Sequence, residues 1–419
     1  MERAPAGRLV SQQYDRRVAV YFFNPSDILN RALLREDQGF IWNPYVGFGT
    51  LWLGVMQGAP YFPGKLISML WPNYWKGQDV MLIVMLLTAG IGNYLLLRSM
   101  GVTREGVTFS ALAYMFCQRL FLVINMPSFT IECLLPLMLY AVNEMVKRKS
   151  LGFALFAGAI GGAQFLGGFP EASFMLGLAS GLFFLWLMIR DYRSNGAFAR
   201  NLLLCLVTAA VTLALSAFQL AEFGKLLIAS HTVHTASYGT VVKEPFWLLA
   251  LFLPNFFGTP FESFWINEIS PHDHMPLSLF CGISTVLLAT MALLWRAAPN
   301  RNYVWFFAAL LFVFIGYDYG FPILKYVGHL PFINMMSTAW NAFVIPFALS
   351  VLAGFGVQSL RQRGAVGRLK IAFAVYVLVV VTLLLMVPGP PLSAPWRSFI
   401  PLIYVVPVFV TAFFLIRQW

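Results

Sequence analysis

Long apolar runs constrain this chain more than any other feature. They are about 16 to 22 residues long with short polar breaks between them, and ~20 helical residues cross the ~30 Å hydrocarbon core of a bilayer. Only 11% of the 419 residues are charged, against roughly 25% in soluble domains, which excludes a soluble enzyme. We therefore predict an all-α polytopic transmembrane bundle with about eleven spans, at 80–98, 105–122, 128–146, 151–168, 171–190, 200–220, 277–296, 302–317, 338–360, 370–387 and 398–416.

Basic residues give this bundle a predicted orientation. The chain has 28 basic and 17 acidic residues, a net charge of +11. They recur in alternate short loops, the pattern of loops that face the cytoplasm, at 147–149, 190–200, 296–301 and 361–370. The positions of the basic residues thus indicate which loops face the cytoplasm. They explain the net positive charge, and no nucleic-acid partner is expected. On this reading 1–79, 221–276, 318–337 and 388–397 lie outside.

The first 79 residues are unusual for an outer segment. They contain no span and no signal peptide, so we expect that a transmembrane helix precedes them in the intact protein, for twelve spans or more. The alternative is that Arg3, Arg8, Arg16 and Arg17 form a cytoplasmic tail, which would invert the loop signs. We divide the chain into a first extracytoplasmic loop, 1–79, with membrane-parallel helices at 26–38 and 63–72, and a bundle, 80–419, with a long outer loop at 221–276.

An acidic residue, Asp27, stands at the start of the first of these helices. It follows Asn24-Pro25-Ser26, which is also the signature of a helix N-cap. After it come Arg31 and an ordered set of aromatic and small residues: Trp42-Asn43-Pro44-Tyr45, Gly47-Phe48-Gly49, Gln57 and Tyr61-Phe62-Pro63.

This order resembles the first extracytoplasmic loop of the YfhO-type bacterial membrane proteins, in the GT-C superfamily of polytopic glycosyltransferases. The resemblance continues at Gly167-Gly168-Phe169-Pro170-Glu171, at 252–258 with Trp265, Asn267 and Glu268, and at 330–332 with 352–356. It implies a GT-C fold at the bacterial inner membrane and an outer-loop acid in the active site, which here is Asp27. The chain departs from the family at 334–340, where relatives often carry an arginine and this sequence has none.

Transfer of a sugar from a polyprenyl phosphate requires a base for the acceptor hydroxyl and cations for the departing phosphate. We predict Asp27 as the catalytic base, with Glu171 and Glu268 as possible second acids. Glu171 could equally be an acid favoured by a helix N-terminus. The predicted phosphate-binding residues are Arg31, Arg35 and Lys65, for which contact with anionic lipid headgroups is the alternative.

Substrate contacts are predicted for residues of the same loop and of the long outer loop: Trp42, Asn43, Tyr45, Gln57 and His272. No cofactor is expected. A divalent metal held by His231, His234 or His272-Asp273-His274 is an alternative of low specificity. Four cysteines without paired spacing predict neither disulfides nor a thiolate site.

Charged residues inside the predicted spans are few. Arg119, Glu132 and Glu144 stand near span ends, and we expect them to reach the membrane interface.

Together these features predict a glycosyltransferase that uses a polyprenyl-phosphate sugar donor and a glycan, lipid or wall-polymer acceptor. The alternatives are a transporter or flippase of lipid-linked saccharide, and a polysaccharide polymerase or ligase.

Overall fold

The chain folds as an all-α protein. A computed structural model describes residues 24–37, 39–46, 48–195, 198–229, 243–254, 256–259, 262–263, 279–296 and 300–387. Strands in this part of the chain are limited to two short antiparallel hairpins, β1 (Trp42–Asn43) with β2 (Thr50–Leu51) and β3 (Gly258–Thr259) with β4 (Glu262–Ser263). Six helical segments of the described residues are long and apolar enough to cross a membrane. The predicted class, a helical membrane protein, is confirmed at this level.

Most predicted spans correspond to helices whose ends differ by a few residues. Long helices replace the runs at 80–98, 128–146, 171–190, 200–220, 302–317 and 370–387: α5 (Tyr74–Ser99), α8 (Pro127–Arg148), α10 (Pro170–Asn195), α11 (Phe198–Ala229), α15 (Arg301–Asp318) and α17 (Ala365–Leu385). Helix α9 (Leu151–Leu166) has only 16 residues, about 24 Å at 1.5 Å per residue. The run at 398–416 lies outside the described residues.

Three predicted spans are shorter or broken. The run 105–122 forms two helices, α6 (Arg104–Met115) and α7 (Gln118–Leu122), because Cys117 takes an extended conformation between them. In the run 277–296, the described residues 279–296 are helical only from Ile283 to Leu294 (α14), after Gly282 with φ +103°. The run 338–360 begins as a 3₁₀ turn, η7 (Thr338–Trp340), before α16 (Val344–Ser359).

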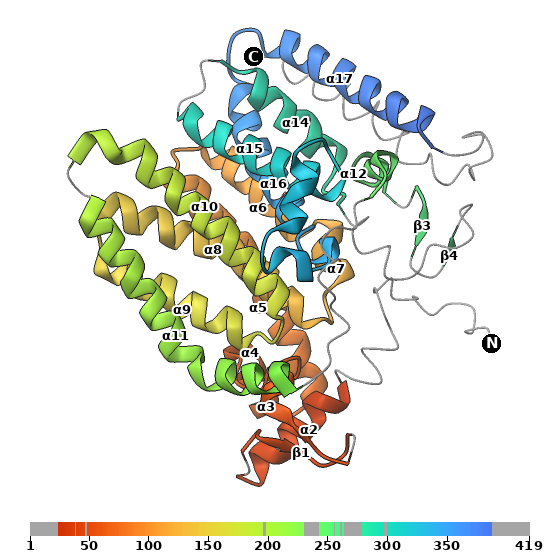
Figure 1. The fold of residues 1–419 in the computed structure, drawn as a ribbon. Helices are drawn as coiled ribbons and strands as arrows, with labels where there is room; N and C mark the ends of the chain where they lie inside the picture. Colours follow the sequence, from red (N-terminus) through yellow and green to blue (C-terminus); the bar gives the residue numbers. More distant parts are fainter. Residues whose placement is uncertain are drawn as a thin grey trace.

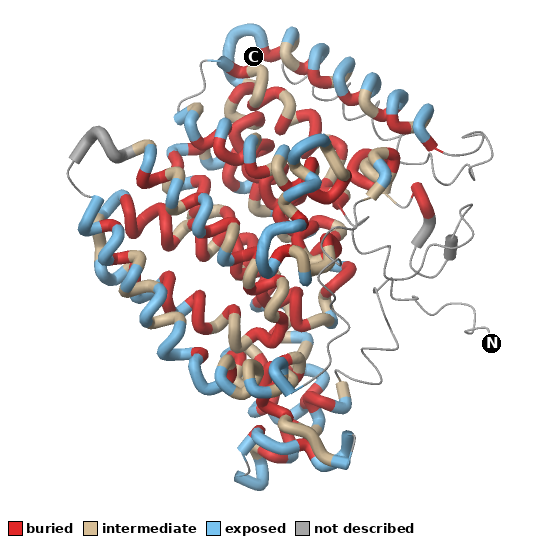
Figure 2. The backbone as a smooth tube through the Cα atoms, viewed as in Figure 1, coloured by how far each residue is buried: buried red, intermediate tan, exposed pale blue. Residues whose placement is uncertain are grey.

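Helices α8 and α16 form the centre of the bundle. The membrane-length windows of both are 89% buried, against 17% for α11 and 28% for α17, which lie at opposite sides of the molecule in Figures 1 and 2. Glycines allow the central helices to approach closely: a Cβ on Gly356 would overlap a backbone carbonyl of α14, and one on Gly106 would overlap a carbonyl of α16. Such small-residue contacts are typical of membrane helix packing.

Contacts between helix ends gather the basic loops at one end of the bundle. Lys147 and Arg190 lie over the ring of Tyr303, Arg200 donates to the carbonyl of Lys149, and Arg361 pairs with Glu105. We call this the basic end. The opposite end holds the first turns of α5, α8 and α10, the last turn of α15 and the turn before α16. We call it the cavity end, because a cavity described in the next subsection lies there.

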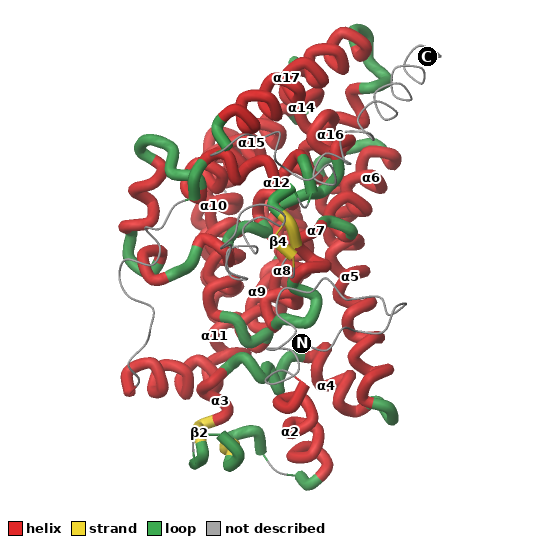
Figure 3. The backbone as a smooth tube through the Cα atoms, turned by 90° about the vertical axis from the view of Figure 1, so that its right-hand side faces the viewer, coloured by secondary structure: helices red, strands yellow, loops and turns green. Residues whose placement is uncertain are grey.

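The first described segment forms a small unit at the cavity end. It contains α2 (Asn24–Arg35), the β1–β2 hairpin, α3 (Trp52–Val55) and α4 (Pro63–Leu70). The segments predicted as short helices at 26–38 and 63–72 are thus helical over most of their length, and their orientation along the membrane stays a prediction. Figures 1 and 3 show this unit at the foot of the bundle, beside the start of α5. Its own core consists of Leu33, Phe40, Trp52 and Met69.

Two of the charged residues expected at the membrane interface are instead fully buried. Arg119 and Glu132 are both 0% exposed and form an ion pair of 2.6 Å. The Nε atom of Arg119 also donates to both carboxylate oxygens, at 3.1 and 3.0 Å. The prediction that they reach the interface was wrong, because each side chain supplies the partner that water would otherwise provide. Glu144 is also largely buried and pairs with Arg148, one turn later.

Candidate functional site

A cavity of about 180 Å³ lies where α2, α4 and α5 meet the turn that leads into α8. Its wall is both polar and apolar, a combination typical of ligand sites. The lining residues are Asn24, Asp27, Ala59, Phe62, Lys65, Trp75, Gln78, Asp79, Met81, Leu82, Ile124, Asn125, Met126, Pro127, Phe129, Thr130 and Gly167.

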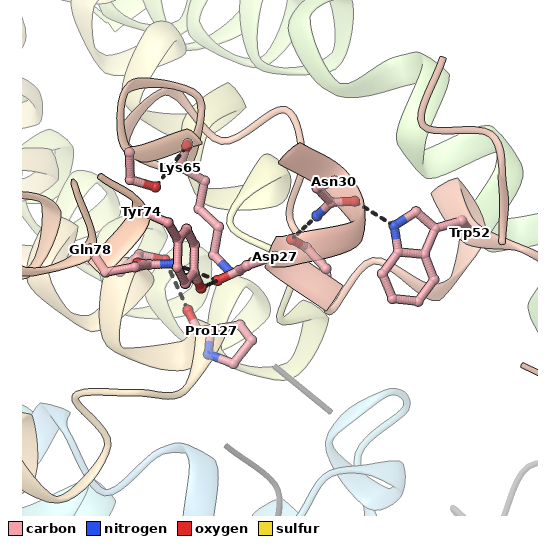
Figure 4. Close-up of polar contacts among 10 residues, drawn as sticks. Asp27, Asn30, Trp52, Lys65, Tyr74, Gln78 and Pro127 are labelled. Atoms are coloured by element: carbon pink, nitrogen blue, oxygen red, sulfur yellow. Dashed lines mark hydrogen bonds and ion pairs between the residues drawn. The ribbon is translucent and has the colours of Figure 1, made fainter. Parts of the chain in front are cut away.

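The predicted acid, Asp27, is part of the cavity wall. It lies in the first turn of α2 and is 4% exposed. Lys65 of α4 pairs with its Oδ1 at 2.5 Å, while the hydroxyl of Tyr74 and the amide nitrogen of Gln78, both on α5, donate to its Oδ2 at 3.1 and 2.6 Å (Figure 4). Asp27 and Gln78 thus form a hydrogen bond although they are 51 positions apart in the sequence.

These three donors leave part of the carboxylate open. An ionised carboxylate has about four lone-pair sites, and within the described part of the chain three are used, one on Oδ1 and two on Oδ2. By this count, the described hydrogen bonds leave one lone-pair site of Oδ1 unused.

Helix α2 is held in place by a buried amide. Asn30, one turn after Asp27, donates to the carbonyl of Gly58 at 3.2 Å and accepts from the indole nitrogen of Trp52 at 2.7 Å (Figure 4). Both bonds join α2 to the segment after the hairpin. They fix the face of α2 that carries Asp27.

The predicted phosphate-binding residues differ in their surroundings. Lys65 lines the cavity, but its partner is Asp27. Arg31 donates to the carbonyls of Trp71 and Pro72, at 2.9 and 2.8 Å, and so closes the C-terminal end of α4. Arg35 is exposed at the end of α2. Of the three cations, only Lys65 lies in the cavity wall.

The four described residues predicted to bind substrate are not part of the cavity wall. Trp42 and Tyr45, in and next to β1, are 53% and 81% exposed. Asn43 is buried and accepts a hydrogen bond from the backbone of Tyr45, and Gln57 is half-buried. None of the four is among the residues that line the cavity.

Of the two predicted second acids, the structure describes only Glu171. Glu171 lies in the first turn of α10, half-buried against the backbone of Ser337, and is not part of the cavity wall. Glu268 and His272 lie outside the described residues, as do His231, His234 and His274. Within the described ranges no cluster of three His, Cys, Asp or Glu side chains could hold a metal ion.

The sequence analysis did not single out Tyr74, Gln78 or Asp79, of which Gln78 and Asp79 line the cavity. All three precede the apolar run at 80–98, in a polar stretch that continues the helix outward. Tyr74 and Gln78 are four residues apart, so they lie on one face of a helix. That spacing was the sequence signal for a polar helix face here.

It also missed a buried cluster at the cavity end. Asp318, the last residue of α15, is 1% exposed and accepts from Asn341 at 2.8 Å. Lys243 lies 3.6 Å from its other oxygen and 5.3 Å from the ring centroid of Tyr319. Burial lowers the pKa of the Lys243 ammonium, and the neighbouring Asp318 partly offsets that effect.

No protein-family model matches the chain, and no curated protein matches it. The helical fold and the chemistry of the cavity are therefore the basis of the function proposed below.

Proposed function

We propose that the protein is a membrane glycosyltransferase of GT-C type. It moves a sugar from a polyprenyl-phosphate donor to a glycan, lipid or wall-polymer acceptor at the outer face of the bacterial cytoplasmic membrane. The observation that carries the proposal is the buried Asp27 carboxylate, which lies in a cavity wall beside the Lys65 ammonium and keeps one lone-pair site open.

This pair matches the two needs of the reaction. The acceptor hydroxyl needs a base, and the departing phosphate needs a cation. Asp27 is assigned the first role and Lys65 the second. Tyr74 and Gln78 hold the carboxylate in one orientation through Oδ2, so that Oδ1 faces the acceptor. Catalysis of this kind depends on such fixed geometry.

The arrangement of charges supports the assigned side of the membrane. Basic loops gather at the end of the bundle opposite the cavity, and loops of this kind face the cytoplasm. The cavity then opens on the outer face. The proposed architecture has about eleven spans, of which the six membrane-length helices of the described chain are a part.

The test is sugar transfer by Asp27→Asn in proteoliposomes supplied with a panel of radiolabelled polyprenyl-phosphate sugars. Loss of a general base lowers kcat by about 10²–10⁴-fold. A matched control is Asp37→Asn, since Asp37 is exposed just after the same helix. Normal transfer by a folded Asp27→Asn protein would falsify the assignment.

A transporter or flippase of lipid-linked saccharide is the second candidate. It is favoured by the buried Arg119–Glu132 ion pair, because ionisable groups buried among membrane-spanning helices often mark transport pathways. A transporter would move labelled lipid-linked sugar across vesicles and would tolerate Asp27→Asn.

A further inference from the structure

The first turns of α5 bring two pairs of side chains to the cavity. Tyr74 and Gln78 donate to the carboxylate of Asp27 (Figure 4). Trp75 and Asp79 follow these two residues directly in the sequence, and both line the cavity. They are four residues apart, so they share one helix face, about 100° around the axis from the pair that holds Asp27. The proposed reaction gives neither of them a role, although both stand beside its base.

The indole of Trp75 is a large apolar surface in the cavity wall. It is 58% exposed, although the ring of Tyr74 packs against it with 4.9 Å between centroids and 66° between planes. Water hydrates the polar atoms of a wall, but contact between water and an apolar ring is unfavourable. The negative face of an indole attracts C–H groups and cations. A ligand that covers Trp75 should therefore present one or the other.

The carboxylate of Asp79 restricts the ligand further. Asp79 is exposed and makes no hydrogen bond or ion pair with the described part of the chain. An ionised carboxylate only accepts hydrogen bonds, so the ligand group beside it must be a donor. A phosphate is negatively charged and would be repelled. Asp79 thus favours a hydroxyl or an ammonium.

The other polar side chains of the wall distinguish between these two donors. Asn24, Gln78 and Asn125 carry amides, and Thr130 carries a hydroxyl. Amides and hydroxyls both donate and accept hydrogen bonds, as the hydroxyls of a sugar do, whereas an ammonium only donates. The wall therefore suits a neutral ligand with several hydroxyls.

The size of the cavity suits one ring of such a ligand. Its volume is about 180 Å³, and a cavity of about 150 Å³ takes up a benzene ring. A pyranose is a six-membered ring with C–H groups on its faces and hydroxyls along its edge. It offers the indole and the carboxylate what each requires.

We propose that Trp75 and Asp79 hold one pyranose ring of a saccharide acceptor beside Asp27. A C–H face of the ring stacks on the indole, and a hydroxyl on its edge donates to the carboxylate of Asp79. Because this carboxylate repels a phosphate, the ring belongs to the acceptor and not to the phosphate-linked donor. The exposed positions of Trp75 and Asp79 leave room for a glycan chain to continue outward. The role of the ring as acceptor rests on the proposed function, but its binding does not.

The first experiment measures binding to the full chain in lipid nanodiscs. The probes are the methyl glycosides of glucose, galactose, mannose and N-acetylglucosamine, with calorimetry for affinity and saturation-transfer NMR for the protons in contact. We expect saturable binding of at least one probe, with the strongest transfer to the C–H protons of one ring face. Absence of saturable binding by all four would refute the ring site.

Variants of Trp75 test the stacking. Trp75→Ala should weaken binding at least tenfold, and Trp75→Phe, which keeps a flat ring, should retain most of the affinity. Trp71→Ala is the matched control, because Trp71 is 40% exposed one turn earlier but does not line the cavity. If both tryptophans served only as anchors at the membrane interface, their Ala variants would bind alike, and that result would overturn the proposal.

Deoxy derivatives of the bound glycoside test the contact with Asp79. One derivative should bind the natural protein at least tenfold more weakly than the parent glycoside. The same derivative and its parent should bind Asp79→Ala equally, since the partner of the missing hydroxyl is gone. Asp37→Ala, at an exposed acid outside the cavity wall, should keep the tenfold difference. A difference of the same size in Asp79→Ala would show that Asp79 holds no hydroxyl.

A transfer assay tests the role of the ring and separates it from the proposed function. With the panel of labelled polyprenyl-phosphate sugars, the glycoside that binds should become labelled, and Trp75→Ala should raise its KM at least tenfold. If label reaches other acceptors but never this glycoside, the acceptor assignment fails. If glycosides bind through Trp75 and Asp79 but no transfer occurs, the ring site stands and the proposed function fails. If transfer is normal and no glycoside binds, the ring site alone is refuted.

Discussion

The buried pair Arg119–Glu132 makes a quantitative prediction about stability. Both side chains are 0% exposed, and the guanidinium makes contacts of 2.6, 3.0 and 3.1 Å with the carboxylate. Glu132→Gln keeps the volume but leaves the cation of Arg119 buried without its counter-charge. Breaking a buried pair in this way costs about 3–5 kcal/mol, or roughly 10²–10⁴ in the folding equilibrium.

Replacing both partners should behave differently. In Arg119→Met/Glu132→Leu no charge is left unpaired, so the free energy of unfolding should stay within about 1 kcal/mol of the natural protein or rise by up to ~4 kcal/mol. The measurement is unfolding by SDS in mixed micelles. Glu105→Gln is the control, because its pair with Arg361 is about half exposed and should contribute only ~0–1 kcal/mol. Two results would refute this reasoning: Glu132→Gln no more costly than Glu105→Gln, or a double variant as unstable as the two single changes added.

Three further predictions address the site and its support. Because the Lys65 ammonium supplies the positive charge of the proposed reaction, transfer should persist in a chelator, whereas Lys65→Met should lower transfer at least tenfold. Inhibition by the chelator that added Mg²⁺ reverses would contradict this. Arg31→Met, which removes two bonds to carbonyls at the end of α4, should lower the stability by about 1–3 kcal/mol and speed proteolysis of the first segment, and an unchanged digestion rate would count against it. Gly356→Ala should lower the free energy of unfolding by about 1–3 kcal/mol through overpacking of α16 on α14. The control is Gly177→Ala, whose added Cβ would meet nothing within 4 Å and should change the midpoint of SDS unfolding little. Equal effects of the two changes would show that the close approach of α16 to α14 is not stabilising.

The sequence predicted the helices well where one apolar run is one helix. It could not predict the break between α6 and α7, because residues 105–122 are apolar on both sides of it. The break comes from tertiary contacts. The backbone nitrogen of Gln118 donates to the carbonyl of Phe280, and Arg119 pairs with Glu132. A straight helix through Cys117 would place neither donor at its partner.

The candidate site was predictable only in part, for a similar reason. Local pattern and family resemblance indicate Asp27, and the structure places it in a cavity wall. Its partners Lys65, Tyr74 and Gln78 are 38, 47 and 51 residues away, so no helical or strand period links them to it. Lys65 was predicted to bind phosphate, and nothing local distinguishes that role from pairing with an acid. The packing of α4 against α2 and α5 decides which anion it meets first.

That pairing couples the two proposed roles of the site. With no ligand bound, the charges of Asp27 and Lys65 offset each other, so this pair holds a base and a cation in the cavity wall. In the proposed reaction the acceptor oxygen bonds to the anomeric carbon as the bond from that carbon to the phosphate oxygen breaks. The acceptor proton goes to Asp27, and the phosphate leaves with the electron pair. Protonation removes the charge that held Lys65, so the ammonium becomes available to the phosphate as its negative charge develops. A cation that is released only when the base is used favours the transition state over the bound substrates, and it predicts that Lys65→Met lowers kcat more than it raises KM for the donor.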